Sequence, residues 1–575
     1  MRLFRRSVAL LLILILLGAV WVWWNRPKKV DMAAYVPADA LLYMEANSVP
    51  QIISGLIDSH GWSVLAGPAG IKTGLLNAGW FSRLATWIGI GSADTIVFSR
   101  MQVAAVVLGV AAADGGDTLN VKPRIALVVE THASESRTLA SIEKNIGNFA
   151  RRAYADAIVE KREVDGAHWI VWSSVSSERR IIAVVAGSVA IIGNHETAIQ
   201  ACLAVQRGQR PSLAGNIEIE GARRRVSTGD ALAFGYMSSQ GAASLFELAA
   251  AVYMGQASEN AMAQGIAANL LPEMAKKIIG NVTWSSRLVN GAIEDDYFIS
   301  TTNDAGARLR AALAPTTANN LPVAELLPLD TYSVTRYSTR DPLMAWRGLS
   351  FSVSSQMDPV VAVMVPPFLK ATLAPYGIDD PDLFLQSIGP NIVTSRTENL
   401  GNRTVLIVEV RDERALHEFV LKRLGTTKPQ VEKVGDIEIL WSEDQKGGAA
   451  SFLSGYLLLG PRDSIRRCLD ARGQKRDLSV SNSFQSSLTI VEQDAPTHVV
   501  TFTRDSAPAQ KFIVFLANLR AARGQPANTQ ELELAIGQLP YAVSEMRFVE
   551  GGIERKTKST FGLLGAITTQ FATKE

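Results

Sequence analysis

Cysteine and histidine are scarce in this chain of 575 residues, and their scarcity argues against two kinds of site. Cys202 and Cys468 are the only cysteines, which excludes a scaffold stapled by several disulfides. No two of the six histidines lie within five residues of each other, so the paired spacing of a zinc-binding helix is missing. We therefore predict no metal site and no cofactor. The sequence also contains no recognisable catalytic motif, so we assign no catalytic residue.

A large excess of positive charge is also missing. The chain has 57 Lys and Arg against 55 Asp and Glu, and residues 1–29 hold six of the basic residues and none of the acidic ones. The remainder therefore has 51 basic and 55 acidic residues, a net charge of −4. A mildly acidic body does not favour nucleic acid as a partner. We interpret the densest basic run, Arg223-Arg224-Arg225, as a solvated loop.

One long run without charge lies at the N-terminus, from Val8 to Trp24. A helix of these 17 residues would rise roughly 25 Å, enough to cross a thin bilayer. Trp residues near its end and basic residues on both sides fit the two membrane interfaces. Residues 1–29 are therefore predicted to be a cytoplasmic tail and transmembrane anchor, with the body outside the cytoplasm. A cleaved signal peptide is the alternative, but no small-x-small motif follows Gly18-Ala19.

The rest of the chain contains an internal repeat. Its repeated strands are each followed by an amphipathic helix, predicted near 135–152 and 412–424, and its last segments are each two strands around a glycine turn. Cys202 and Cys468 occupy matching helix positions and are predicted to be buried free thiols. The matched segments are 36–39 with 327–330, 124–130 with 403–409, 166–173 with 435–442, 190–193 with 457–460, and 287–294 with 547–554.

Alternating strands, intervening helices and short links predict an α+β fold. We expect two tandem homologous lobes, 33–314 and 323–575, each a mainly antiparallel sheet with helices packed on it, preceded by one transmembrane helix. The linker between them is predicted around Pro315–Pro322, which is small, polar and rich in proline. A pseudo-twofold axis would relate the two lobes.

The anchor, the Pro-x-Asp turn, the strands ending in Glu and the Gly-x-x-x-Ile-x-Trp strand together resemble large bacterial envelope proteins that are grouped only as a domain of unknown function. The resemblance covers most of residues 34–575. It implies a duplicated, membrane-tethered bacterial protein outside the cytoplasm, and it brings no known activity with it.

Four repeated residues are weak candidates for a binding surface. Glu130 and Glu409 end matching strands, where a carboxylate could act as an acid or base but more often accepts hydrogen bonds from the next helix. Trp172 and Trp441 are aligned by the repeat and could stack on a ligand, although a repeated Trp on an alternating strand is more often in the core.

Positions where the two copies differ in charge are interpreted as solvated, since a packed core would not tolerate such changes. Glu45 aligns with Arg336, and Asp295-Asp296 aligns with Arg555-Lys556.

These features favour a membrane-anchored binding or scaffold protein of the bacterial envelope, without catalysis. Its partner would be an envelope protein, a lipid or a cell-wall component. One alternative is a hydrolase whose site is assembled in the cleft between the lobes. Another is a carrier of an apolar, lipid-like ligand, held by the apolar stretches at 241–279 and 357–376.

Overall fold

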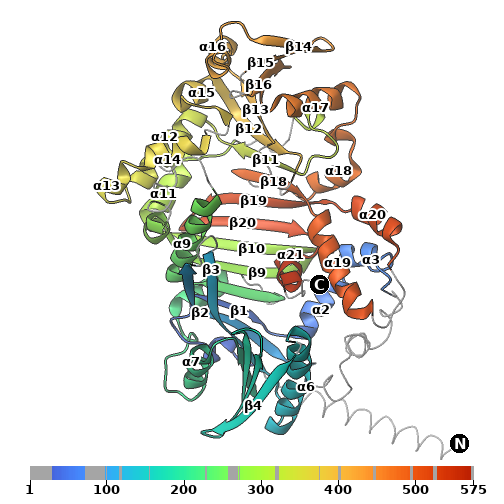
Figure 1. Ribbon diagram of the computed structural model, residues 1–575. Coiled ribbons are helices and arrows are strands. Elements are labelled where there is room, and N and C mark those ends of the chain that lie inside the picture. The colour runs from blue at the N-terminus through green and yellow to red at the C-terminus, as the bar shows by residue number, and fades with distance from the viewer. Residues whose placement is uncertain are drawn as a thin grey trace, which may run out of the picture.

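The computed structural model describes residues 29–71, 97–98, 100–114, 119–154, 156–226, 230–256, 270, 272–316, 323–373, 376–398, 403–443, 448–491, 496–521 and 527–570. This part of the chain is α+β, as predicted, with helices packed on both faces of a large antiparallel sheet (Figure 1). The predicted anchor, residues 8–24, and most of the predicted linker lie outside the described residues. Within them, no helix combines the length and apolar character needed to cross a membrane.

In the first half of the chain, ten strands pair side by side in the order β4-β5-β6-β7-β3-β2-β1-β8-β9-β10, and every pair is antiparallel. These strands are β1 (Leu42–Ala46), β2 (Gln102–Asp114), β3 (Leu119–Glu130), β4 (Ala157–Val164), β5 (Ala167–Ser174), β6 (Arg180–Ala186), β7 (Val189–Gly193), β8 (Ala233–Met237), β9 (Ile279–Val289) and β10 (Ala292–Thr301).

The second half repeats this connectivity. Its strands pair in the order β14-β15-β16-β17-β13-β12-β11-β18-β19-β20. They are β11 (Ser333–Ser338), β12 (Ile388–Arg396), β13 (Thr404–Val410), β14 (Gln430–Val434), β15 (Ile437–Trp441), β16 (Ala449–Leu453), β17 (Tyr456–Gly460), β18 (Val499–Arg504), β19 (Tyr541–Val549) and β20 (Gly552–Ser559).

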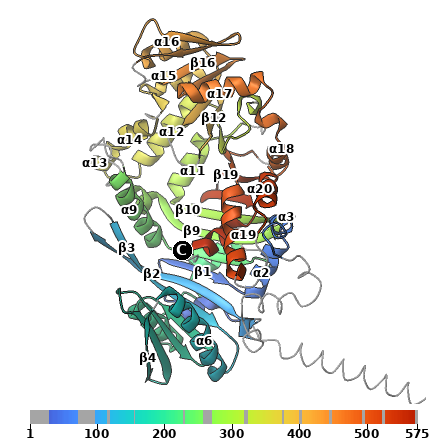
Figure 2. The ribbon, with the colours of Figure 1, turned by 45° about the vertical axis from the view of Figure 1, so that its right-hand side comes forward.

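The two halves are joined edge to edge, because β10 pairs antiparallel with β20. The whole strand order is therefore a palindrome centred between these two strands, which lie in the middle of the molecule in Figure 1. Asp296 lies opposite Lys556 at this centre. Figure 2 shows the elongated result, with β4 and α6 near one end and α16 at the other.

Helices cover the sheet in two layers. On one face, called the α6 face, α6 packs on Ile170, Trp172 and Val185 in the first half. On the opposite face, called the α8 face, α7 and α8 pack on Val128, Phe234 and Tyr236. The helices of the first half are η1 (Met32–Tyr35), α2 (Val49–Ile57), α3 (His60–Leu65), α6 (Glu135–Ala153), α7 (Glu196–Gln206), α8 (Ile217–Val226), α9 (Ser239–Gln256) and α11 (Asn303–Ala312).

The second half has the same two layers, with α16 in one core and α17 and α18 in another. Its helices are η3 (Ala324–Leu326), α12 (Pro342–Ser354), α13 (Pro359–Ala362), α14 (Val365–Leu373), α15 (Pro381–Ser387), α16 (Glu413–Arg423), α17 (Arg462–Gly473), η5 (Leu478–Val480), α18 (Asn482–Leu488), α19 (Ser506–Ala521), α20 (Thr529–Gly537) and α21 (Gly562–Gln570). The apolar stretch 241–279 is described in part, since α9 covers its start and residues 257–269 and 271 lie outside the described residues.

Several local predictions are confirmed. The helices expected near 135–152 and 412–424 are α6 and α16. α6 has an acidic residue in its first turn and two arginines in its last, which complement the helix dipole. Cys202 on α7 and Cys468 on α17 are buried and free, and burial raises the pKa of each thiol to about 12.

Helices from one half also pack on helices from the other. Trp62 and Leu65 of α3 share a core with Phe512 and Ile513 of α19. A second shared core brings Leu270 together with Val353 of α12. The halves are therefore connected by strand pairing and by two apolar contacts.

The predicted alignment of Trp172 with Trp441 is wrong by one residue. In the β4–β5 hairpin Val164 pairs with Ala167, and in the β14–β15 hairpin Val434 pairs with Ile437. The fourth residue after Ala167 is Val171, and the fourth residue after Ile437 is Trp441. Trp441 therefore corresponds to Val171 and not to Trp172. Because successive strand residues face opposite sides of a sheet, the two Trp side chains lie on opposite faces.

Candidate binding site at the junction of the halves

Glu130 and Glu409, two of the sequence candidates, hold local structure together. Glu130 is buried and accepts hydrogen bonds from the Tyr35 hydroxyl at 3.0 Å and the His132 backbone N–H at 2.8 Å. Burial and the neighbouring Glu130 raise the pKa of Tyr35 to about 12. Glu409 accepts a hydrogen bond from the Asn391 side chain at 3.1 Å. Ten strands separate β3 from β13, so the structure does not bring the two glutamates together.

The two candidate tryptophans are also far apart. Trp172 is buried beneath α6, and the nitrogen of its indole lies 3.5 Å from where a side chain would begin at Gly147. Trp441 is half-buried, and the Arg462 guanidinium lies 4.0 Å from the centre of its ring. Neither lies near the junction of the halves.

The interpretation of the charge-changing positions as solvated is wrong for Glu45, Arg336 and Asp295, whereas Arg555 is exposed as expected. Glu45 is 6% exposed, Arg336 is 2% exposed and Asp295 is 2% exposed. A core tolerates such changes where each charge finds a partner of opposite sign, and no single-sequence pattern reveals that partner.

Eight strand positions form one straight row across the α8 face. Residues paired across neighbouring strands point to the same side of a sheet, so the row presents its side chains together. Its charges are acidic in the first half and mainly basic in the second, with Asp296 and Lys556 at the centre. In order, the row is Glu45, Phe234, Ser285, Asp296, Lys556, Glu545, Val500 and Arg336.

The basic run 223–225 forms the last turn of α8, which corrects its interpretation as a solvated loop. Arg223 makes ion pairs with Glu45 at 2.9 Å and Asp31 at 2.8 Å. Tyr43 also donates to Glu45, at 2.7 Å. Burial nevertheless raises the pKa of Glu45, against the opposing effect of Arg223.

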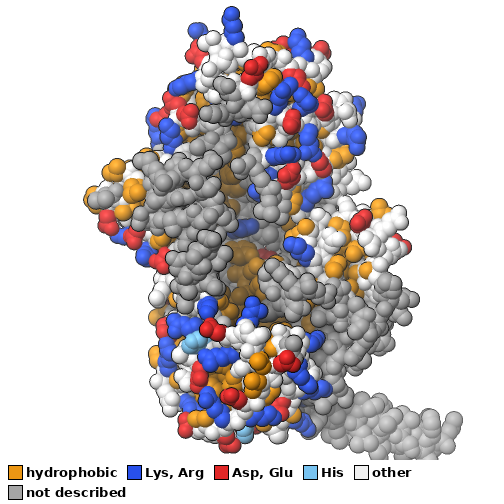
Figure 3. Space-filling view, in the orientation of Figure 1, with side chains coloured by type: hydrophobic (Ala, Val, Ile, Leu, Met, Phe, Trp, Pro, Cys, Tyr) orange, Lys and Arg blue, Asp and Glu red, His pale blue; other side chains and the backbone are white. Residues whose placement is uncertain are grey.

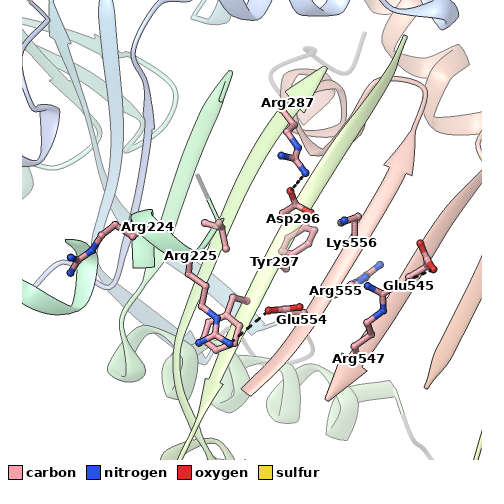
Figure 4. A pocket seen from close by; sticks show the side chains of 12 residues that line it. Arg224, Arg225, Arg287, Asp296, Tyr297, Glu545, Arg547, Glu554, Arg555 and Lys556 are labelled. Atoms are coloured by element: carbon pink, nitrogen blue, oxygen red, sulfur yellow. Dashed lines mark ion pairs between the residues drawn. The ribbon is translucent and has the colours of Figure 1, made fainter. Parts of the chain in front are cut away.

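Beyond α8 lies a depression of about 240 Å³, called the central trough (Figure 4). α8 forms one wall, and four neighbouring strands form the floor. The residues that line it are Arg224, Arg225 and Val226 of α8, Arg287 of β9, Asp296, Tyr297 and Phe298 of β10, Glu554, Arg555 and Lys556 of β20, and Glu545 and Arg547 of β19.

The first-half side of the trough is tightly paired. Arg287 makes ion pairs with Glu294 and with Asp296, the latter at 3.1 Å. Lys558 approaches Glu294 from β20 at 3.3 Å. Burial opposes the charge of Arg287, yet the bond to Glu294 and the charge of Asp296 outweigh it and raise the pKa of Arg287. Burial and Glu294 raise the pKa of Asp296, while Arg287 and Lys556 act in the opposite direction.

The second-half side is built from arginines. Arg225 reaches across from α8, lies 3.7 Å above the Phe298 ring and makes a 3.7 Å ion pair with Glu554 (Figure 4). Arg547 makes an ion pair with Glu545 at 3.6 Å. The stacked Arg225 guanidinium is fixed in place, because cation–π and ionic contacts constrain it together.

His498 lies next to this cluster and is 7% exposed. Its Nδ1 accepts a hydrogen bond from the Phe548 N–H at 3.3 Å, and its Nε2 has no hydrogen-bond partner among the described residues. Burial and the charge of Arg547 lower the pKa of His498 to about 4. The ring is therefore neutral at pH 7, and Nε2 carries its proton as a donor.

Sequence reasoning missed this site, although one signal pointed to it. The repeat matches Arg287 and Glu294 with Arg547 and Glu554, and both pairs lie directly across a hairpin. A charged pair retained in two copies is the sequence signature of the trough. Among the described residues, no group of three or more His, Cys, Asp or Glu is arranged to hold a metal ion.

Comparison with known proteins adds no relative: no family model, no curated protein and no solved structure matches this chain. The function proposed below is therefore argued from the geometry of the central trough.

Proposed function

We propose that this chain is a membrane-anchored binding or scaffold protein of the bacterial envelope, with the central trough as its binding surface. In this proposal residues 8–24 form a single transmembrane helix and place the body outside the cytoplasm. Residues 33–314 and 323–575 are two homologous lobes related by a pseudo-twofold axis. The shared strand order of the two halves supports the duplication.

The observation that carries the proposal is the position and chemistry of the central trough. Both halves contribute to it, through α8, β9 and β10 on one side and β19 and β20 on the other. Its charged side chains stand on strands in the middle of the sheet and hold one another by ion pairs, so their positions are fixed before any ligand arrives. A rigid, polar depression of this kind is suited to recognition.

The described part of the opposite face presents a different surface. Figure 3 shows this α6 face hollowed between the two halves, with hydrophobic side chains gathered in the hollow. At the centre of the sheet Asp296, Lys556 and Glu545 point to the α8 face, whereas Arg555 alternates to the α6 face. More of the charge at the centre is therefore presented on the α8 face, which favours this face for a charged partner.

Membrane attachment is tested by fractionation of cells that make the full-length chain. The protein is expected in the membrane fraction after carbonate washing, and a C-terminal alkaline phosphatase fusion is expected to be active, since that enzyme folds outside the cytoplasm. Release of the full-length chain by carbonate would contradict the anchor.

Binding is tested by photo-crosslinking in the same cells. A photoreactive amino acid at Arg224, on the wall of the trough, is expected to give a crosslinked adduct whose mass identifies an envelope component. Arg137 on α6 is the matched control, because it is an exposed arginine on the other face of the sheet. Equal adducts at the two positions, or none at Arg224, would count against the trough as a binding surface.

A further inference from the structure

The α6 face of the sheet is open where the two halves meet. Along β18 and β19 the side chains that point to the α8 face are largely buried, whereas every side chain of β18, β19 and β20 that points to the α6 face is half-buried or exposed. Figure 3 shows this face hollowed between the halves. Solvent therefore reaches the strands themselves, which form the floor of the hollow.

The charges that this floor exposes are of one sign. At the α6-facing positions of β10, β20, β19, β18, β11 and β12, Arg555 and Arg396 are exposed, and neither makes an ion pair with a described residue. Among the described residues at these positions Asp295 is the one carboxylate, and it is 2% exposed. Asp295 accepts hydrogen bonds from the Trp284 indole at 3.0 Å and from the Leu563 backbone N–H at 2.8 Å. The accessible charge of the floor is therefore positive, which favours an anionic partner.

Each exposed arginine lies near a tyrosine. Arg555 and Tyr297 pair across β20 and β10, and the Arg555 guanidinium lies 5.7 Å from the centre of the Tyr297 ring. Near the other end of the floor, burial raises the pKa of Tyr376, the neighbouring Tyr337 adds to this effect and Arg396 opposes it, so these three groups lie close together. Tyr337 is 41% exposed. The floor therefore presents a guanidinium and a phenol ring near each end.

A straight row of hydroxyl side chains runs across the floor between the two arginines. Its members pair across neighbouring strands, so they point to the same side of the sheet, and all of them are half-buried. The hydroxyl oxygens of Ser544 and Thr557 lie 2.7 Å apart, and those of Thr335 and Thr501 lie 3.1 Å apart. Hydroxyl groups both donate and accept hydrogen bonds. From β20 to β12, the row is Thr557, Ser544, Thr501, Thr335 and Thr394.

The two arginines lie at opposite ends of this row and on opposite sides of it. The strand pairing that starts at Arg555 reaches β12 at Ile392, two residues before Thr394, whereas Arg396 lies two residues after Thr394. Four strand spacings separate β20 from β12, about 19 Å. A ligand that contacts both arginines must therefore be an extended chain that crosses the hydroxyl row.

We propose that the hollow on the α6 face binds an acidic glycan, a chain of sugar rings that carries carboxylates, laid across the strands from Arg555 to Arg396. Each guanidinium matches the two oxygens of a carboxylate. The inference adds a second binding site to the proposed binding function and does not depend on the central trough.

The chemistry between the arginines favours sugar rings over other anionic chains. Sugar hydroxyls donate and accept hydrogen bonds, as the Ser and Thr hydroxyls of the floor do. Tyr297 and Tyr337 offer flat apolar rings with a polar end, which suit a sugar ring that is apolar on its faces and polar at its edge. An acyl chain would instead remove water from the hydroxyl row without replacing its hydrogen bonds.

The test titrates the full-length protein, in an uncharged detergent, with an oligogalacturonate in a calorimeter. An uncharged cello-oligosaccharide of the same length, an oligoglutamate and phosphatidylglycerol nanodiscs are titrated in parallel. The oligogalacturonate is expected to bind more tightly than the other three. Arg555→Gln and Arg396→Gln are each expected to weaken its binding roughly tenfold, since each removes a charge-assisted contact.

Two further variants separate the contributions of ring and charge. Tyr337→Ala changes an exposed side chain and is expected to weaken the binding of the oligogalacturonate severalfold. Arg137→Gln is the matched control, because Arg137 is an exposed arginine on α6, which packs on β5, β6 and β7 and not on the floor of the hollow. This variant should bind like the wild type. Rising salt should weaken the binding of the oligogalacturonate, since exposed charges are screened.

Absence of oligogalacturonate binding overturns the proposal, as does binding that Arg555→Gln and Arg396→Gln both leave intact. Equal or tighter binding of the oligoglutamate would assign an acidic peptide, and binding of the nanodiscs alone would assign a lipid, so either result also overturns it. If no glycan binds but Arg224 still gives its crosslinked adduct in cells, this inference alone fails and the central trough remains a binding surface.

Discussion

At the scale of single residues, the molecule places ionisable groups where water is excluded. Asp505, at the start of α19, is 8% exposed and accepts a hydrogen bond from the backbone N–H of Thr560. Burial raises the pKa of Asp505 to about 6, the bonds from Thr560 oppose this effect, and the nearby Asp295 adds to it. The folded state therefore holds this proton more tightly than the unfolded state does.

The sign of the pH effect follows. Stability from Asp505 is fully present below its unfolded pKa, near 4, and is lost as pH rises through 6. Relative to an Asp505→Asn variant, the wild type is expected to gain up to about 3 kcal/mol of unfolding free energy between pH 7 and pH 4. Urea unfolding of both proteins across this range measures the difference. Unfolding free energies that change with pH in the same way for the two proteins would contradict the raised pKa of Asp505.

The two buried thiols give a second prediction at this scale. A pKa of about 12 leaves Cys202 and Cys468 almost fully protonated at pH 8, and the thiolate is the species that reacts. Alkylation by iodoacetamide is therefore expected to be at least roughly a thousandfold slower in the native protein than in urea. Intact mass measured over time provides the rates, and rapid native labelling of either cysteine would show that its helix opens readily.

At the scale of elements, local sequence signals were reliable where the structure is local. Asn290-Gly291 and Gly551 have the positive φ angles of tight turns, and each joins the two strands of a predicted hairpin. The predicted helices α6 and α16 follow from their amphipathic pattern. The alignment of Trp172 with Trp441 differs from the structure by one residue because it follows residue identity, whereas strand pairing is set by the hairpin turns.

The central strand pair carries a testable coupling. Asp296 and Lys556 lie directly opposite each other between β10 and β20, and the charge of Lys556 lowers the pKa of Asp296. A double-mutant cycle with Asp296→Asn and Lys556→Gln is expected to give a coupling free energy of about 0.5–1 kcal/mol. The cycle removes the separate contribution of Arg287 to Asp296. Additive effects in chemical denaturation would mean that the pair does not interact.

At the scale of the whole molecule, the two halves depend on each other. Separating them would expose the backbone of β10 and β20 and the apolar cores shared by α3 with α19 and by Leu270 with α12. Exposed edges and apolar patches favour aggregation. Residues 1–316 made alone are therefore expected to aggregate, whereas coexpression with 317–575 should yield a soluble one-to-one complex in detergent. Size-exclusion chromatography distinguishes the outcomes, and a folded, monomeric first half would contradict this dependence.

The α+β class and the repeated strands could be predicted from sequence, but the central trough could not. Its floor depends on the pairing of Asp296 with Lys556, residues that lie 260 positions apart and that no local periodicity connects. The burial of Glu45 and Arg336 was hidden for the same reason, since Arg223 and the other charges that accompany them come from distant elements. Burial of charge is a property of the assembled sheet.

The outermost strand of the first half, β4, sets a limit on the size of the sheet. Seven of its eight residues are exposed, and four in succession, Glu160 to Glu163, are charged. A second chain that tried to extend the sheet here would have to strip water from these side chains, which discourages polymerisation. These charged side chains therefore oppose the addition of strands from another molecule, so a protein with such a long sheet does not assemble into fibres through this edge.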